Sequence, residues 1–202
     1  MVEAHNGDGL TDAEIVQTYR EKYADRGWPT EAQVIDRSID EAVASFVDVD
    51  QARKKASDAL KIVVQAAKPE IAELLQAGLS LRWHMDAEMP RKPESEYTKE
   101  EKRKYLGKDS KFAALENRNH IAWRALHEAM REQAASLPDL GGCKEDSSYP
   151  VRNALPGMFV SRLDHHARSP YVPALPAPDE GPSTPRTPGP TGGSANPALT
   201  LG

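Results

Sequence analysis

The sequence predicts an all-α protein: a small helical bundle of about five to six helices, followed by a long Pro/Gly-rich tail that is largely disordered or extended. Two observations lead to this expectation. Residues 10–137 contain repeated helix-capping patterns, each followed by apolar residues at spacings of three and four. Residues 138–202 contain twelve prolines and eight glycines among 65 residues, about the level at which a chain buries too little to fold alone.

The first helix is predicted by three signals that agree on one start. Thr11 is placed to cap the helix and Glu14 to reach back to it, while Leu10 and Ile15 form a hydrophobic staple. Apolar and tyrosine side chains then recur on one face. The helix is therefore expected over about residues 12–25, before a Gly and a Pro that stop it.

A second capping pattern, Thr30 with Gln33, follows directly and predicts a helix that runs to about Phe46. The connection over residues 26–29 is short, so we expect the first two helices to fold against one another as a hairpin or an angular pair. Trp28 should lie over their corner.

A third helix, capped by Asp48 or Asp50, is expected to bury a face of small residues. Pro69 then either breaks it or kinks a continuous helix of about 35 residues that reaches Trp83. The apolar face comprises Ala52, Ala56, Ala59, Leu60, Val63, Val64 and Ala67, and continues through Ile71, Leu74, Leu75, Gly78, Leu79 and Leu81.

Residues 85–97 are expected to form a polar linker, because two residues in it precede prolines and are pushed out of helical geometry. Thr98 and Glu101 then begin a short charged helix that Gly107 ends.

The last strong helix should begin at Asp109 or Ser110 and reach Leu137. Its apolar stripe is interrupted at Asn119, where the period predicts an apolar side chain. Asn119 is therefore predicted to make a buried polar contact.

These boundaries divide the chain into five parts. They are a flexible N-terminus (1–9), an N-terminal helical region (10–84), the linker (85–97), a C-terminal helical region (98–137) and a low-complexity tail (138–202). An apolar island, which includes Met158, Phe159 and Leu163, makes residues 156–166 a candidate docking segment for the body or for a partner.

The net charge of −5 is distributed unevenly along the chain. Residues 1–50 hold four basic and twelve acidic side chains, whereas residues 51–137 hold seventeen basic and thirteen acidic ones. The N-terminal part should repel nucleic acid, and the middle part should tolerate it.

Membrane and secretion signals are missing from the sequence. It has no apolar run of about 18 residues, and its first ten residues do not follow the pattern of a secretory signal. Cys143 is the single cysteine, which fits a reducing compartment. We expect a cytoplasmic protein, or part of a larger particle assembled in the cytoplasm, without membrane contact.

No catalytic, cofactor or metal motif is recognisable. His120 and His127 share a helix face, His165 and His166 are adjacent, and Cys143 follows two glycines, but none of these completes a known ligand or nucleophile pattern. We therefore expect no cofactor, and the sequence gives an enzyme no support.

A basic segment favours one alternative, a nucleic-acid-associated regulator or packaging factor. Residues 91–111 hold eight basic side chains, with Tyr97 and Tyr105 between them as stacking groups, although five acids reduce the net charge to +3. The basic residues are Arg91, Lys92, Lys99, Lys102, Arg103, Lys104, Lys108 and Lys111.

The favoured interpretation is a non-enzymatic interaction or assembly subunit that binds a partner protein, or a second copy, through its small-residue face and its tail. The predicted interface comprises Ala52, Ala56, Ala59, Leu60, Val63, Leu74, Leu81, Met158, Phe159 and Leu163. In general layout only, the chain resembles small helical accessory and assembly proteins of bacteriophages or actinobacteria, a resemblance that assigns no residue.

Overall fold

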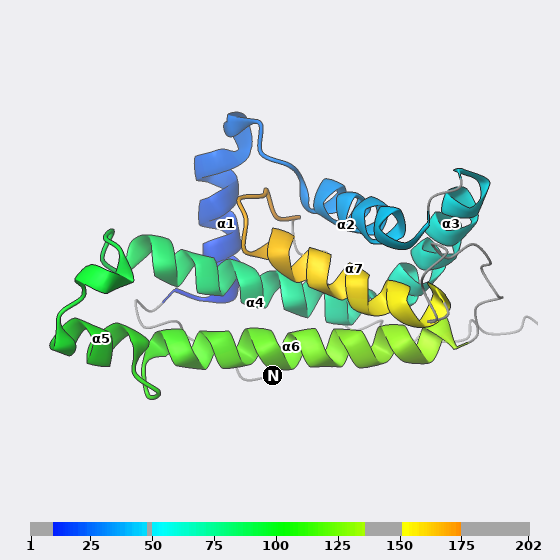
Figure 1. Ribbon diagram of the computed structural model, residues 1–202. Coiled ribbons are helices and arrows are strands. Elements are labelled where there is room, and N and C mark those ends of the chain that lie inside the picture. The colour runs from blue at the N-terminus through cyan, green and yellow to red at the C-terminus, as the bar shows by residue number, and fades with distance from the viewer. Residues whose placement is uncertain (1–9, 48–49, 136–150, 175–202) are drawn as a thin grey trace, which may run out of the picture.

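The computed structural model describes residues 10–47, 50–135 and 151–174, and within these ranges the protein is all-α (Figure 1). The described elements are α1 (Asp12–Tyr23), η1 (Ala24–Arg26), α2 (Glu31–Phe46), α3 (Asp50–Ala66), α4 (Lys68–Ala87), η2 (Glu94–Glu96), α5 (Lys99–Leu106), α6 (Lys111–Ala134) and α7 (Val151–Ala167). The predicted fold class is confirmed. The described part contains seven α-helices where five to six were expected, and α7 is the additional one.

Three of the predicted helix starts are capping boxes in the structure. The Thr11 hydroxyl accepts a hydrogen bond from the Glu14 amide at 3.3 Å, and the Glu14 carboxylate accepts one from the Thr11 amide at 2.6 Å. The same reciprocal arrangement begins α2 at Thr30 and α5 at Thr98. Each box satisfies amide groups that a helix start leaves unpaired, so these starts depend on local sequence alone.

Pro69 separates two helices and does not kink a single one. α3 ends at Ala66 and α4 begins at Lys68, with a non-helical backbone at Ala67 between them (φ −100°, ψ 21°). Pro69 lies in the first turn of α4, where its missing N–H removes no helical hydrogen bond. The sequence leaves open a break or a kinked continuous helix at Pro69, and the structure shows the break.

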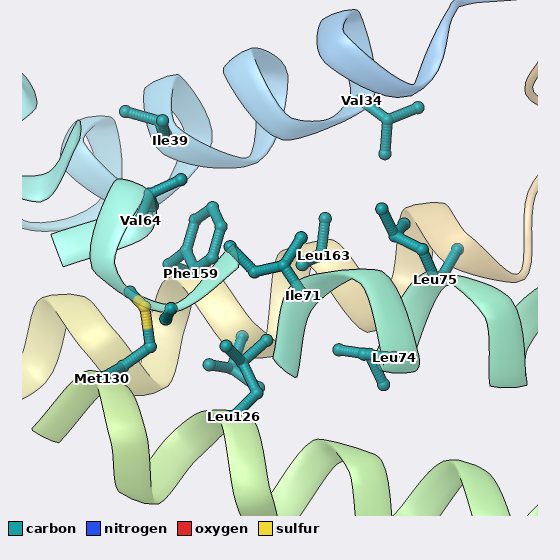
Figure 2. Close-up of a cluster of buried hydrophobic side chains, with 14 of the residues drawn as sticks. Val34, Ile39, Val64, Ile71, Leu74, Leu75, Leu126, Met130, Phe159 and Leu163 are labelled. Carbon is teal, nitrogen blue, oxygen red and sulfur yellow. The ribbon is translucent and has the colours of Figure 1, made fainter. Parts of the chain in front are cut away.

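α7 is the central helix of the described bundle. It packs against α2 on one side and against α6 and α4 on the other (Figure 1). α4 and α6 lie side by side and run in opposite directions. Figure 2 shows Phe159 and Leu163 of α7 among apolar side chains from α2, α3, α4 and α6, and both are fully buried. The core therefore depends on α7.

Residues 151–174, which the sequence analysis assigns to the tail, belong to the folded body, so the prediction is wrong for them. α7 covers the whole candidate docking segment 156–166, and it docks on the core of its own chain. Pro156 lies inside α7 and removes one helical hydrogen bond, a loss that the apolar contacts of the following turns offset. Residues 175–202 lie outside the described ranges.

Residues 171–174 form a strap that ties the end of the described chain to the corner between α1 and α2. The Val172 amide donates to the Pro29 carbonyl at 2.8 Å, and the Glu31 amide donates to the Val172 carbonyl at 3.0 Å. The buried Tyr171 hydroxyl donates to the Leu75 carbonyl at 3.0 Å, and burial raises the pKa of Tyr171. The strap therefore ties the corner between α1 and α2 to α4.

α1 and α2 form an angular pair, as one of the two expected arrangements. α1 packs mainly on α4, whereas α2 packs on α7 (Figure 1). Trp28 lies over the corner as expected, with its ring stacked on Tyr23 at a centroid distance of 4.3 Å. The corner is therefore filled by aromatic side chains.

α4 buries nine of its residues, with polar Ser80 and His84 among them. The His84 ring contacts the Glu88 carboxylate at 2.6 Å, and the Lys111 ammonium lies 2.5 Å from the same carboxylate, which joins the end of α4 to the start of α6.

No helix in the described ranges combines the length and the apolar character that crossing a bilayer requires.

Candidate functional site

α6 buries one stripe and leaves its opposite side open. Ser110 caps the helix, since its hydroxyl accepts a hydrogen bond from the Ala113 amide at 3.2 Å. The buried stripe consists of Leu115, Asn119, Ala122, Leu126, Met130 and Ala134. At the edge of this stripe, where α6 meets α7, polar and aromatic side chains gather.

Asn119 is fully buried, which confirms the predicted interruption of the stripe. Its side-chain amide donates to the Asp164 carboxylate of α7 at 2.7 Å, and its carbonyl oxygen has no hydrogen-bond partner among the described residues. Asp164 also pairs with Arg168 one turn later at 3.2 Å. Asn119 therefore fixes α6 to α7 and retains an acceptor that is not satisfied.

Three parallel rings line the edge of α6. The ring of Trp123 lies 5.1 Å from that of His127 at an interplanar angle of 7°, and 6.4 Å from that of His120 at 1°. Trp123 is half-buried and packs partly against the core. We call His120, Trp123 and His127 the α6 aromatic strip.

The α6 aromatic strip separates two hollows in the surface. The first, of about 560 Å³, lies between α6 and α7 and is lined by His120, Trp123 and Asp164 among others. The second, of about 480 Å³, shares Trp123 and is lined further along α6 by Arg124, His127, Glu128, Arg131 and Glu132. Trp123 therefore lies between two adjoining hollows, each of which is lined in part by charged side chains.

Gly157 of α7 allows the strip to approach the bundle closely. A Cβ atom at position 157 would lie 3.2 Å from Nε2 of His127, which is tighter than ordinary packing. The missing side chain therefore makes room for the His127 ring between α6 and α7.

No protein-family model, curated protein or solved structure matches this chain.

The predicted interface residues lie mainly in the interior of the chain itself. Seven of the ten are between 0% and 2% exposed, and Ala59 is 8% exposed. Met158 is partly buried, and the side chain of Ala52 is not among those that the structure describes. The seven are Ala56, Leu60, Val63, Leu74, Leu81, Phe159 and Leu163. In this fold they are covered by neighbouring helices of the same chain, with α7 among them.

The basic segment 91–111 lies around α5 at the end of the bundle (Figure 1). Two of its eight cations are paired, since Lys92 contacts Glu101 at 2.8 Å and Lys111 contacts Glu88. Lys104 lies over the Tyr105 ring at 4.8 Å. The other five are exposed and form no ion pair among the described residues: Arg91, Lys99, Lys102, Arg103 and Lys108.

The histidines are not gathered into a metal centre within the described ranges, where no three His, Cys, Asp or Glu side chains meet in a suitable group. His120 and His127 flank Trp123, and His166 faces Glu41 on α2. Cys143 lies outside the described residues. The shared face of His120 and His127 thus belongs to the aromatic strip.

Sequence reasoning missed Trp123 and Asp164 as site residues. The spacing of His120, Trp123 and His127 by three and four residues places them on one side of a helix, and it was available in the sequence. The contribution of Asp164 depends on α7 packing beside α6, which no local pattern reveals.

Proposed function

We propose that this chain is a non-enzymatic interaction or assembly subunit that binds a partner polypeptide along the α6 aromatic strip. The observation that carries the proposal is the half-buried Trp123, stacked between two histidine rings and placed between two adjoining hollows. A partly exposed tryptophan with arginines beside it has the composition of an interface hot spot.

The partner is expected to be a polypeptide with an apolar side chain to cover Trp123 and charged groups on either side of it. The second hollow alternates Arg124, Glu128, Arg131 and Glu132, so it offers both signs of charge to a partner. Because the small-residue face is buried within the chain, the strip replaces it in the proposal.

The proposal also includes a cytoplasmic location and a contribution of the tail to partner binding. The single cysteine supports a reducing compartment. The Pro/Gly-rich composition of residues 175–202 supports binding by an extended segment that orders on its partner.

Replacement of Trp123 by Ala tests the proposed function. The matched control is Trp28→Ala, which removes another half-buried tryptophan at the α1–α2 corner. Self-association is measured by native mass spectrometry, and other partners by quantitative capture from the source cells. Loss of a hot-spot tryptophan is expected to weaken binding at least about 30-fold.

The proposal predicts that Trp28→Ala retains the same bound protein that Trp123→Ala loses, with both variants folded by circular dichroism. It is contradicted if the native chain is monomeric and if Trp123→Ala captures the same proteins in the same amounts.

A second candidate is nucleic-acid binding by the basic segment, favoured by the five exposed and unpaired cations around α5. A salt-titrated gel shift tests it. Binding should weaken as salt rises, and changing Lys102, Arg103 and Lys104 to Glu should abolish it without unfolding the protein, because α5 has no buried residue. The absence of a shift at low salt would eliminate this candidate.

A further inference from the structure

A separate polar hollow of about 380 Å³ lies between α2 and α7, away from the α6 aromatic strip. Its polar lining comes from both helices: Arg37, Glu41 and Ser45 from α2, and Arg162, His165 and His166 from α7. The two helices pack closely along their length, so their side chains are held in a defined arrangement (Figure 1).

Glu41 is the one carboxylate among these residues, and three basic groups converge on it. Nε of Arg37 donates to it at 2.9 Å, Nε2 of His166 lies at 3.1 Å, and Nε of Arg162 lies at 3.9 Å. Burial by itself would raise the pKa of Glu41, but hydrogen bonds from Arg37 and His166 outweigh it and lower the pKa below its usual value. Glu41 is therefore ionised and orients the cations.

The hollow nevertheless has more donors than acceptors. Nε of Arg162 is buried and has no hydrogen-bond acceptor, because the Glu41 oxygen at 3.9 Å is too far away. The two guanidinium groups are partly exposed, with side-chain exposures of 64% for Arg37 and 43% for Arg162. The two arginines against one carboxylate leave a net charge of +1 before the histidines are counted. An anion would supply the missing acceptors.

We propose that the hollow between α2 and α7 binds a phosphate group, held between the guanidinium groups of Arg37 and Arg162. Two planar guanidinium groups from facing helices offer several hydrogen-bond donors. A tetrahedral anion can accept from more of these donors than a planar carboxylate can. His166 and Glu41 are positioning residues, since they hold the arginines and the end of α7 in place. The size of the hollow fits a phosphate ion or a small phosphomonoester.

Phosphate binding here is independent of the partner-binding strip and can hold or fail separately from it. The test is an NMR titration of the full chain that follows the Nε–H signals of arginine and the ring signals of His166. Inorganic phosphate and O-phosphoserine are added in separate experiments, and sodium chloride keeps the ionic strength constant. The two probes distinguish a free ion from a phosphorylated group as the better ligand.

The proposal predicts saturable shifts at Arg37, Arg162 and His166 with a dissociation constant on the order of 1 mM, as two charge-assisted hydrogen bonds at a partly exposed site would give. Arg162→Gln and Arg37→Gln should each weaken binding at least about tenfold. Arg26→Gln in η1, which replaces an exposed arginine outside the hollow, is the matched control and should bind phosphate like the native chain. The proposal is overturned if the shifts stay linear to about 20 mM phosphate, or if Arg26→Gln weakens binding as much as Arg162→Gln.

Discussion

α5 and α7 differ in what keeps them helical. α5 has a complete capping box at Thr98 and no buried residue, and its main contact is with α6. α7 contains an internal proline, yet Phe159, Val160 and Leu163 are fully buried. Local sequence therefore stabilises α5, whereas tertiary burial stabilises α7. Substitutions in α7 should damage the fold, and substitutions in α5 should leave it intact.

Truncation of Phe159 is expected to have the largest effect. Phe159→Ala removes a side chain that contacts several helices of the core, and it should lower the free energy of unfolding by about 3–5 kcal/mol. Tyr105→Ala in α5, the control, should cost less than about 1 kcal/mol. Urea denaturation measures both. Equal losses would show that the two helices do not differ in this way.

The close contact between α4 and α7 should be the next most sensitive point. A Cβ at Gly78 would lie 2.8 Å from Cβ of Ala167 and 3.1 Å from its carbonyl oxygen. Gly78→Val should therefore push α7 away and lower the free energy of unfolding by about 1–3 kcal/mol, which a lower thermal midpoint would show. Ala72→Val, on the exposed side of α4, should change the thermal midpoint little. Similar midpoints for both variants would contradict the contact.

The start of α5 should respond to acid. The hydrogen bonds from Lys92 and from the Thr98 backbone lower the pKa of Glu101 from 4.5 to about 2. Because the folded pKa is the lower one, the stabilisation is fully present above pH 4.5 and is lost as the pH falls toward 2. Carboxylate NMR should show Glu101 titrating near 2 and, in Lys92→Gln, at a higher pH. An ordinary titration in the native chain would contradict the ion pair.

Helix starts are the features that the sequence predicts best. Thr11, Thr30 and Thr98 begin helices in the structure because a capping box needs only four consecutive residues. α7 is harder to predict. Its buried positions 155, 159, 163 and 167 have helical spacing, but Pro156 and Gly157 lie among them and oppose a helix locally. Contacts with α2, α4 and α6 reverse this preference.

The small-residue face shows the limit of pattern analysis. Its spacing correctly indicates a surface that another helix approaches closely, as Gly78 and Ala167 do. Periodicity alone does not say whether that helix belongs to the same chain or to a partner. Because helices of the same chain, α7 among them, cover this face, the proposed binding surface is the α6 aromatic strip, where Trp123 is neither fully buried nor fully exposed.

Hydrogen exchange of the full chain tests most directly whether α7 is an integral part of the fold. If α7 is held by the core, the amides of residues 157–167 should exchange as slowly as those in the middle of α4, and those of α5 should exchange many times faster. Exchange of α7 at the rate of α5 would contradict this role of α7, because the apolar face of α4 would then lack part of its cover.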